Sequence, residues 1–389
     1  MTQPSAASST IGDSALAKLT VGKGTANTAI RWLPLFLPTL AIAFDSTTAV
    51  LALLFGLAEA AGLSTLLTGS LMDAGRERLV IIVALLSLVV ASALALTGSI
   101  WLLGAAMIII GAASGNITVA GHAWISARAS FNRRARFIGI YEFSWASALL
   151  IGVPIIALLI NWFGWRAPFI AIAVLAVLAA LGVATVNDGE RSNEPTPRKG
   201  DKTPITTDAW LVIGAAASIA FTGLSLAVVT GTWLDETLGV STGGVGLVAI
   251  LFGIAELIGS MSSSAFADRL GKRRSMQCSI GFVLVGLAVV AFAGSSLLIG
   301  ATGLLIFFLG FEYAIVTSFS LVSEAMPESR GRALGVGNAT STVLRGIGVA
   351  VSGLLFERSG IHASVLLAVG GAIAALVFLA VIAPRRPDL

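Results

Sequence analysis

Charged residues are scarce in this chain. Asp, Glu, Lys and Arg make up 11% of its 389 residues, whereas hydrophobic residues make up 56%. The charged share is less than half of that in ordinary soluble domains, and it is too small to give a protein of this length a polar surface. Together with a mean hydropathy of +0.95, this scarcity predicts that lipid covers most of the protein exterior.

Cysteine and histidine are almost absent as well. With one cysteine, Cys278, and two histidines, the chain can form no internal disulfide and none of the usual Cys/His metal clusters. It also contains no glycine-rich phosphate-binding loop and no nucleophile with a nearby base. We therefore expect no metal, no cofactor and no enzymatic activity, and an ion gradient rather than a nucleotide as the energy source of any transport.

Twelve apolar runs are long enough to cross a membrane as helices, which takes about 20 residues. Helices are expected because unpaired backbone groups are too costly in lipid and the runs lack the alternation of barrel strands. The runs are 16–42, 47–70, 79–97, 100–125, 137–161, 167–187, 209–233, 243–266, 275–295, 298–323, 333–357 and 362–383. Lys18, Lys23 and Arg31 interrupt the first run, so eleven spans preceded by an amphipathic tail is the alternative. The predicted fold is an all-α polytopic membrane protein.

Basic residues lie mainly on one side of these spans. The net charge of +4 therefore does not indicate nucleic-acid binding, because the positive charges form no single patch. The eighteen on that side are Arg76, Arg78, Arg128, Arg133, Arg134, Arg136, Arg191, Arg198, Lys199, Lys202, Arg269, Lys272, Arg273, Arg274, Arg330, Arg332, Arg385 and Arg386. Only Arg166 and Arg358 fall in the opposite loops. Since cytoplasmic loops carry the excess of Lys and Arg, both termini are expected in the cytoplasm.

An internal repeat divides the chain. "LFGLAE" at 54–59 returns as "LFGIAE" at 251–256, and two further matches follow in order at nearly the same offset. The one extended polar segment, rich in Pro, Ser, Thr and charge, has the composition of a flexible linker. We therefore expect two six-helix halves, residues 1–187 and 209–389, joined by a cytoplasmic linker at 188–208.

The repeat includes a short charged loop that follows the second span of each half, "GSLMDAGRER" (69–78) and "SAFADRLGKRR" (264–274). These loops resemble the Gly-x-x-x-Asp-x-x-Gly-Arg-Arg motif of the major facilitator superfamily, and the resemblance covers essentially the whole chain. In the first copy one residue is missing between Asp73 and Gly75, and in the second Ser264 replaces the first Gly. The resemblance implies a gate that latches the cytoplasmic side; the alternative is plain headgroup anchoring. The gate residues would be Gly69, Asp73, Gly75, Arg76, Arg78, Asp268, Arg269, Gly271, Arg273 and Arg274.

A narrower resemblance concerns "YEFSWASALLIGVP" (141–154), "LFGIAELIGS" (251–260) and "LRGIGVAVSGLLFERSG" (344–360). These segments look like the arabinose-efflux and drug-export-like branch of that superfamily. The antiporter motif of the fifth helix departs from the usual pattern, since no Gly pair follows Gly152-Val153-Pro154. The resemblance implies a secondary transporter that works by alternating access.

Several ionisable residues lie at membrane depth, where they are costly and normally face the bundle interior. Glu59, Glu256 and Glu312 each precede a charged loop residue by 12 to 14 positions, which is about 20 Å along a helix. One interpretation is that Glu312 and Arg345 neutralise one another, and Arg31 and Lys23 are alternative partners for Glu59. Glu256 is then left without a cation, which favours its protonated form. The proton-coupling candidates are Glu256 first, then Glu59, Glu312 and Glu142.

Polar and aromatic residues of the spans are candidates for a central substrate cavity. They are Lys23, Asn27, Arg31, Asn116, Trp145, Tyr313 and Arg345. The alternative for the uncharged ones is a bridge between helices or a place in an aromatic belt. His122, toward the cytoplasmic end of the fourth span, is expected either to pack near the headgroups or to shuttle protons.

Paired six-helix halves suit rocking about a central site better than a continuous pore, so a channel is less favoured. The expected function is proton-coupled export of a small amphipathic or drug-like molecule by a monomer in a bacterial cytoplasmic membrane. The alternative is proton-coupled uptake of a nutrient or of an anionic metabolite held by Arg31. The expected partners are that small molecule, protons and the lipid bilayer.

The basic asymmetry generates a test of orientation. A cysteine placed in the 188–208 linker, in a Cys278→Ser background, is expected to react with a membrane-impermeant maleimide only after the cells are permeabilised. Labelling of that cysteine in intact cells at the rate seen in permeabilised cells would overturn the orientation.

Overall fold

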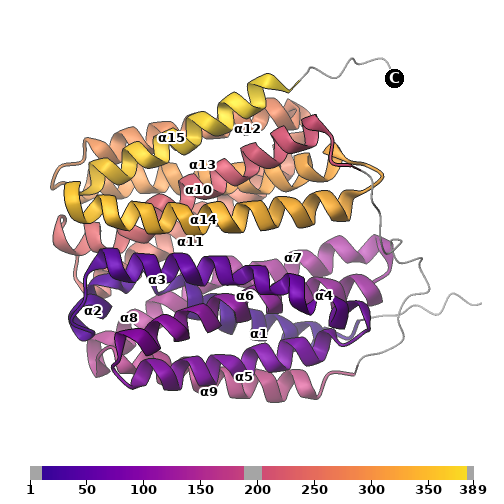
Figure 1. The fold of residues 1–389 in the computed structure, drawn as a ribbon, viewed down its shortest axis with the longest axis horizontal. Helices are drawn as coiled ribbons and strands as arrows, with labels where there is room; N and C mark the ends of the chain where they lie inside the picture. The colour runs from indigo at the N-terminus through magenta and orange to yellow at the C-terminus, as the bar shows by residue number, and fades with distance from the viewer. Residues whose placement is uncertain (1–10, 188–203, 383–389) are drawn as a thin grey trace, which may run out of the picture.

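The computed structural model describes residues 11–187 and 204–382, and within these ranges it consists of helices and short connections (Figure 1). The helices of the N-terminal half are α1 (Asp13–Arg31), η1 (Pro34–Phe36), α2 (Leu37–Ala43), α3 (Thr48–Ala60), η2 (Ala61–Ser64), α4 (Thr65–Asp73), α5 (Glu77–Leu96), α6 (Ile100–Arg128), α7 (Phe131–Ser147), η3 (Ala148–Gly152), α8 (Val153–Phe163) and α9 (Arg166–Ala184). Those of the C-terminal half are α10 (Thr207–Glu236), α11 (Thr242–Leu270), α12 (Lys272–Ala291), α13 (Leu297–Ala325), α14 (Arg330–Ser359) and α15 (Ile361–Val381).

The expected twelve-span bundle is confirmed in the described ranges. Eleven helices there are long and apolar enough to cross a membrane. The segment that they leave out is the first, α1 to α2, which Pro34 and Pro38 interrupt. It nevertheless packs inside the bundle against α5, α6, α7 and α9, so the segment that the charges made doubtful is a full member of the fold.

Two later spans are also irregular. The second passes through the 3₁₀ turn η2 between α3 and α4, and the fifth through the π-helical turn η3 between α7 and α8. Gly152 ends η3, and a Cβ at this position would lie 2.3 Å from Oγ1 of Thr28 on α1. Only a glycine permits this approach, and a π-turn followed by Pro154 is a common cause of a bend in a helix.

The two halves form separate layers in Figure 1, indigo to magenta for α1–α9 and rose through orange to yellow for α10–α15. The proposed division of the chain falls in the segment between them. Residues 188–203 of the expected linker, like the basic residues 385 and 386, lie outside the described residues. The first helix of the C-terminal half, α10, begins at Thr207.

We call the end of the bundle at which α9 ends and α10 begins the linker end, and the other the opposite end. At the linker end, Lys18 near the start of α1 donates a 2.8 Å hydrogen bond to Thr185 after α9. At the opposite end, α3 and α11 begin while α10 and α14 end.

Small residues bring the halves together toward the opposite end. A Cβ on Gly231 would lie 2.2 Å from the carbonyl oxygen of Leu35, and one on Gly353 would lie 2.2 Å from Cβ of Ala52. Gly246, four residues into α11, approaches Ala157 of α8 in the same way. At the linker end, by contrast, α4 packs against α5 and α6 of its own half, and Leu66 and Leu67 on its surface are exposed. The structure is therefore closed at the opposite end.

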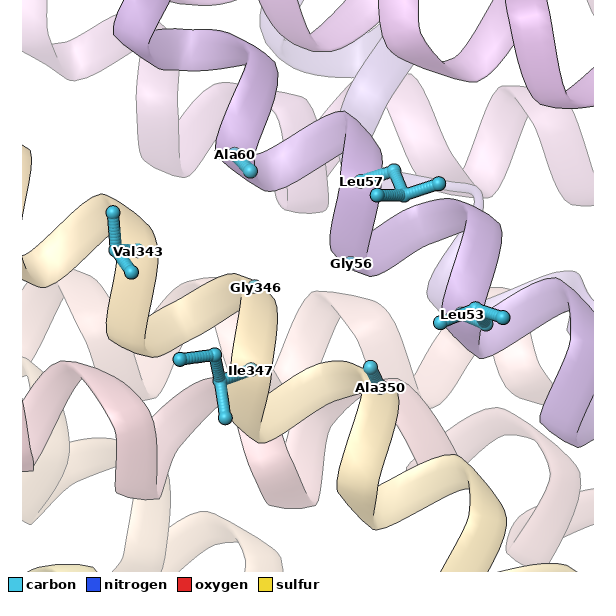
Figure 2. Close-up of a pocket in the computed structure, with 8 residues that line it drawn as sticks. All are labelled: Leu53, Gly56, Leu57, Ala60, Val343, Gly346, Ile347 and Ala350. Carbon is cyan, nitrogen blue, oxygen red and sulfur yellow. The ribbon is translucent and has the colours of Figure 1, made fainter.

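The two halves also meet along α3 and α14, which cross at Gly56 and Gly346. On the outside of this crossing lies an apolar groove of about 220 Å³ (Figure 2). Leu53, Leu57 and Ile347 line it, and each exposes between 46% and 50% of its surface. Such a wall belongs against lipid rather than water.

The charged loops at the linker end turn at glycine in both halves. Gly75 has φ 82° and Gly271 has φ 79°, a left-handed conformation that glycine adopts without a Cβ penalty. In the first loop the N–H of Arg76 bonds the carbonyl of Leu71 at 2.9 Å, which closes the end of α4. Both repeats therefore turn at the glycine of the motif.

One arginine after each turn secures the last helix of its own half. Arg78 donates to the carbonyl oxygen of Val186 beyond α9. In the second half, Arg273 donates to Ile382 at 2.8 Å and to Ala380 at 3.1 Å, at the end of α15. Basic groups at helix C-termini bond the last carbonyls and complement the helix dipole. These two arginines thus act within a half, a role that the gate motif did not predict.

Through these bonds Arg273 is expected to stabilise the folded C-terminal half. Arg273→Ala is expected to destabilise the C-terminal half by about 1–3 kcal/mol, because two carbonyls lose a charged donor. The measurement is thermal unfolding in detergent, with Arg274→Ala, an exposed neighbour, as the control. Equal melting temperatures for the two variants would contradict this role.

Candidate functional site

A buried ion pair joins the two halves between α1 and α11. The guanidinium of Arg31 donates to both carboxylate oxygens of Glu256, at 2.8 and 2.5 Å. Arg31 also donates to the carbonyl of Trp145 at 3.0 Å, and its guanidinium carbon lies 4.2 Å from the centroid of that indole ring. The side chain of Glu256 is 3% exposed. A bidentate pair with a stacked aromatic ring is the arrangement that best offsets the cost of burying both charges.

A second cross-half ion pair lies between α3 and α14. Nε of Arg345 is 3.0 Å from a carboxylate oxygen of Glu59. Glu59 and Glu256 occupy equivalent positions of the repeat, and each reaches a basic residue of the other half. Relative motion of the halves must therefore change the environment of both carboxylates.

The N-terminal half holds a third group of charges, centred on Glu142 of α7. Its carboxylate pairs with Lys23 of α1, whose side chain is 1% exposed, and lies 2.5 Å from Nε2 of His122 on α6. The ammonium of Lys23 is 4.6 Å from the ring centroid of Tyr141, and the Tyr141 hydroxyl donates to the carbonyl of Ile117. Glu142 is 42% exposed, so this group extends from the core to an accessible surface.

Glu312 of α13 differs from the other three membrane glutamates. Within residues 11–187 and 204–382 its carboxyl group forms no hydrogen bond or ion pair. Its Cβ lies close to Gly259, one turn of α11 beyond Glu256, and its carboxyl interacts electrostatically with Glu256, Arg31 and Glu142. It is a partly buried carboxyl without a counter-charge of its own, beside the cross-half pair.

The pairing predicted from sequence is wrong in three respects. Glu312 does not pair with Arg345, Glu59 pairs with neither Arg31 nor Lys23, and Glu256 is not left without a cation. Spacing along the chain gives the depth of a residue in the membrane, but the partner depends on how each helix is rotated about its axis. Both of these ion pairs join residues of different halves, whereas the pairs predicted from the sequence lie within one half.

Three uncharged cavity candidates serve as bridges between helices. Asn27 donates to Ser144 at 3.2 Å, and the hydroxyls of Tyr313 and Ser275 are 2.5 Å apart. Asn116 accepts from Thr68 at 2.5 Å and donates to Ser64 at 2.8 Å. Their polar groups are engaged in helix packing. Trp145, by contrast, is 39% exposed while it stacks on Arg31, so it remains the aromatic candidate for contact with a substrate.

The gate candidates of both halves lie at the linker end. Asp268 pairs with Lys272 at 3.0 Å, and Lys272 also pairs with Glu324 at the end of α13. The side chains of Asp73, Arg76, Arg269 and Arg274 are exposed there. Gly69 lies in α4, and a Cβ at this position would have no neighbouring atom within 4 Å. The predicted latch role of these residues stays a prediction.

A small pocket in the C-terminal half adjoins the second ion pair. It encloses about 60 Å³ between α10, α13 and α14 and includes Arg345. Its other lining residues are Ala216, Ala220, Ile315, Ser318, Phe319, Val322, Leu334, Gly337, Asn338 and Ser341. Sequence reasoning did not find this pocket, because its polar members are scattered over two helices.

The chain belongs to the Major Facilitator Superfamily, whose profile matches residues 21–226 and again residues 211–389. It is therefore a secondary transporter of the multi-pass membrane class. An uncharacterised MFS-type transporter of Bacillus subtilis, YwfA, is 25% identical over 83% of this chain and 81% of its own length. An MFS-type efflux pump of Mycolicibacterium smegmatis is 26% identical over 69% of this chain and 68% of its own length.

Solved structures show the same fold. A D-xylose–proton symporter superposes with a TM-score of 0.78 at 16% identity, over 95% of this chain and 98% of the symporter. A bacterial homologue of the human lysosomal transporter Spinster, in an inward-facing and unoccupied conformation, gives 0.68 at 16% identity and covers 95% of each chain.

The Arg31–Glu256 pair generates a stability prediction. Glu256→Gln is expected to destabilise the protein by about 3–5 kcal/mol, because it leaves the Arg31 guanidinium buried without a counter-charge. The double variant Arg31→Gln/Glu256→Gln should recover much of the loss. Thermal unfolding in detergent measures both. A Glu256→Gln variant that melts like the wild type would show that Arg31 does not depend on this carboxylate.

Proposed function

We propose that this protein exports a small amphipathic compound across the cytoplasmic membrane in exchange for protons, with Glu312 as the proton-carrying group. The single observation that carries this proposal is the unpaired Glu312 carboxyl among otherwise paired membrane charges. The sequence had favoured Glu256, but the bidentate partner on Glu256 makes Glu312 the better candidate.

Charge balance supports a proton at this position. The interior groups contain four carboxylates, on Glu59, Glu142, Glu256 and Glu312, but only three lysine or arginine side chains, Lys23, Arg31 and Arg345. An uncompensated charge in a low-dielectric interior is costly. Binding of one proton by Glu312 removes that charge. Its release returns the charge, and a cationic group of a substrate then compensates it as well as a proton does.

The hydrogen bonds of Arg31 indicate which charge the substrate carries. Arg31 has both carboxylate oxygens of Glu256 and the Trp145 carbonyl as acceptors, which leaves little donor capacity for an anion. This argues against the alternative of anion uptake. Export is supported by the relative described as an efflux pump. A vesicular amine transporter of the rat, 29% identical over 40% of this chain and 30% of its own length, supports an amine-bearing substrate.

The proposed orientation assigns a transport state to the structure. If the linker end faces the cytoplasm, closure at the opposite end makes this the cytoplasm-facing state. The charged loops that carry Asp73 and Asp268 would then close in the other state, with the halves rocking as units and the chain working as a monomer.

The proposal predicts a separation of two transport modes. In proteoliposomes with an imposed pH gradient and ethidium as an amphipathic probe, Glu312→Gln is expected to abolish accumulation of the probe. Gln mimics the protonated carboxyl, so downhill exchange of ethidium should survive. Glu328→Gln, on the exposed connection between α13 and α14, is the matched control and should transport like the wild type.

The outcomes separate the alternatives. Accumulation by Glu312→Gln at the wild-type rate would overturn the coupling role of Glu312. Wild-type accumulation that an uncoupler leaves unchanged would overturn proton coupling itself.

A further inference from the structure

A glutamate side chain of one half caps a helix of the other half at the opposite end of the bundle. Oε2 of Glu357, in the last turn of α14, accepts a 2.9 Å hydrogen bond from the backbone N–H of Ala49. Ala49 is the second residue of α3. The two residues lie 308 positions apart in the chain, and no sequence motif connects them.

The first amides of a helix have no partner within the helix and carry its positive dipole end. At α3 the Thr47 hydroxyl accepts from Val50, which satisfies one of them. Ala49 is buried, so its N–H depends on an acceptor supplied by the protein. Glu357 supplies this acceptor, together with a negative charge at the favourable end of the dipole.

Packing of α14 on α3 places the carboxylate. One turn before Glu357, Gly353 allows the two helices to approach so closely that a Cβ would lie 2.2 Å from Cβ of Ala52. Phe356, next to Glu357, is buried. On the other side of the contact, Asp45 adopts a left-handed conformation with φ 47° in the turn that leads into α3. A non-glycine residue in that region is strained, and surrounding contacts must hold it there.

Other carboxylates of the C-terminal half lie near Glu357. Glu236 at the end of α10 interacts electrostatically with both Asp235 and Glu357. All three carboxylates belong to the C-terminal half, so their mutual repulsion does not depend on how the halves are placed. The N-terminus of α3, which comes from the other half, is the positive element that offsets this repulsion at Glu357 when the opposite end is closed.

We propose that Glu357 and the N-terminus of α3 form a charge–dipole latch that holds the opposite end closed and is released when the transporter switches state. The latch rests on the alternating access of a secondary transporter and on no assumption about protons or substrate. Loss of the Glu357 charge then shifts the equilibrium toward the state that is open at the opposite end.

The test measures both ends of the protein at once. In a Cys278→Ser background, one pair of spin labels is placed at Ile42 and Leu298, exposed positions of the two halves at the opposite end. A second pair is placed at Leu67 and Phe266, exposed positions near the linker end. Double electron–electron resonance of the full chain in nanodiscs, without a proton gradient, gives the distance distribution of each pair.

Glu357→Ala is expected to raise the ratio of opposite-end-open to closed molecules by roughly tenfold, the effect of losing one charged hydrogen bond. The Ile42–Leu298 distances should lengthen while the Leu67–Phe266 distances shorten. Glu357→Gln, which keeps an acceptor but no charge, should give a smaller shift. Arg358→Gln, the exposed neighbour, should leave both distributions unchanged.

Two results would overturn the latch. Distributions of Glu357→Ala that match those of the wild type at both ends would show that the contact does not influence the equilibrium. Lengthening at the opposite end without shortening at the linker end would mean local fraying of α3 or α14 rather than a change of state. Because no substrate or gradient is used, failure of the proposed Glu312 coupling leaves this outcome unaffected.

Discussion

Charges inside the membrane are costly unless they are paired, and in this protein two of the ion pairs connect the two halves. Arg31 with Glu256 and Arg345 with Glu59 each join a residue of one half to a residue of the other. An unpaired charge in this environment costs several kcal/mol. Any motion that separates the halves must therefore keep these pairs together or exchange their partners.

The small residues obey a complementary constraint. Gly231, Gly246 and Gly353 allow backbones of the two halves to touch toward the opposite end, and such contacts hold through van der Waals packing that separates without exposing a charge. Ion pairs between the halves, together with apolar glycine contacts toward the opposite end, suit a structure in which the two halves rock against each other. The Glu357 contact is the exception at that end, because its separation leaves a polar N–H without a partner.

The sequence predicts the skeleton of the molecule well. Hydrophobic runs locate the spans, and the repeat locates the turns at Gly75 and Gly271, whose left-handed backbone the structure confirms. It does not predict which charges meet. Placing His122 against Glu142, or Glu357 over Ala49, requires the rotation of each helix and the crossing angles between helices. Those depend on the packing of many side chains, and one sequence holds no separate signal for them.

The charges of the interior are not symmetric between the two halves, although the sequence repeats. Glu59 and Glu256 occupy equivalent positions of the repeat, but their partners lie on non-equivalent helices, α14 and α1. The N-terminal half adds Lys23 and Glu142, whereas the C-terminal half adds the unpaired Glu312. If the two halves carried the same charges, the two states would have equivalent interiors. Protonation of one carboxyl would then favour neither state. With one extra carboxyl on one side only, the energy of the interior differs between protonated and deprotonated forms as the halves move, and such a difference is the thermodynamic requirement for coupling.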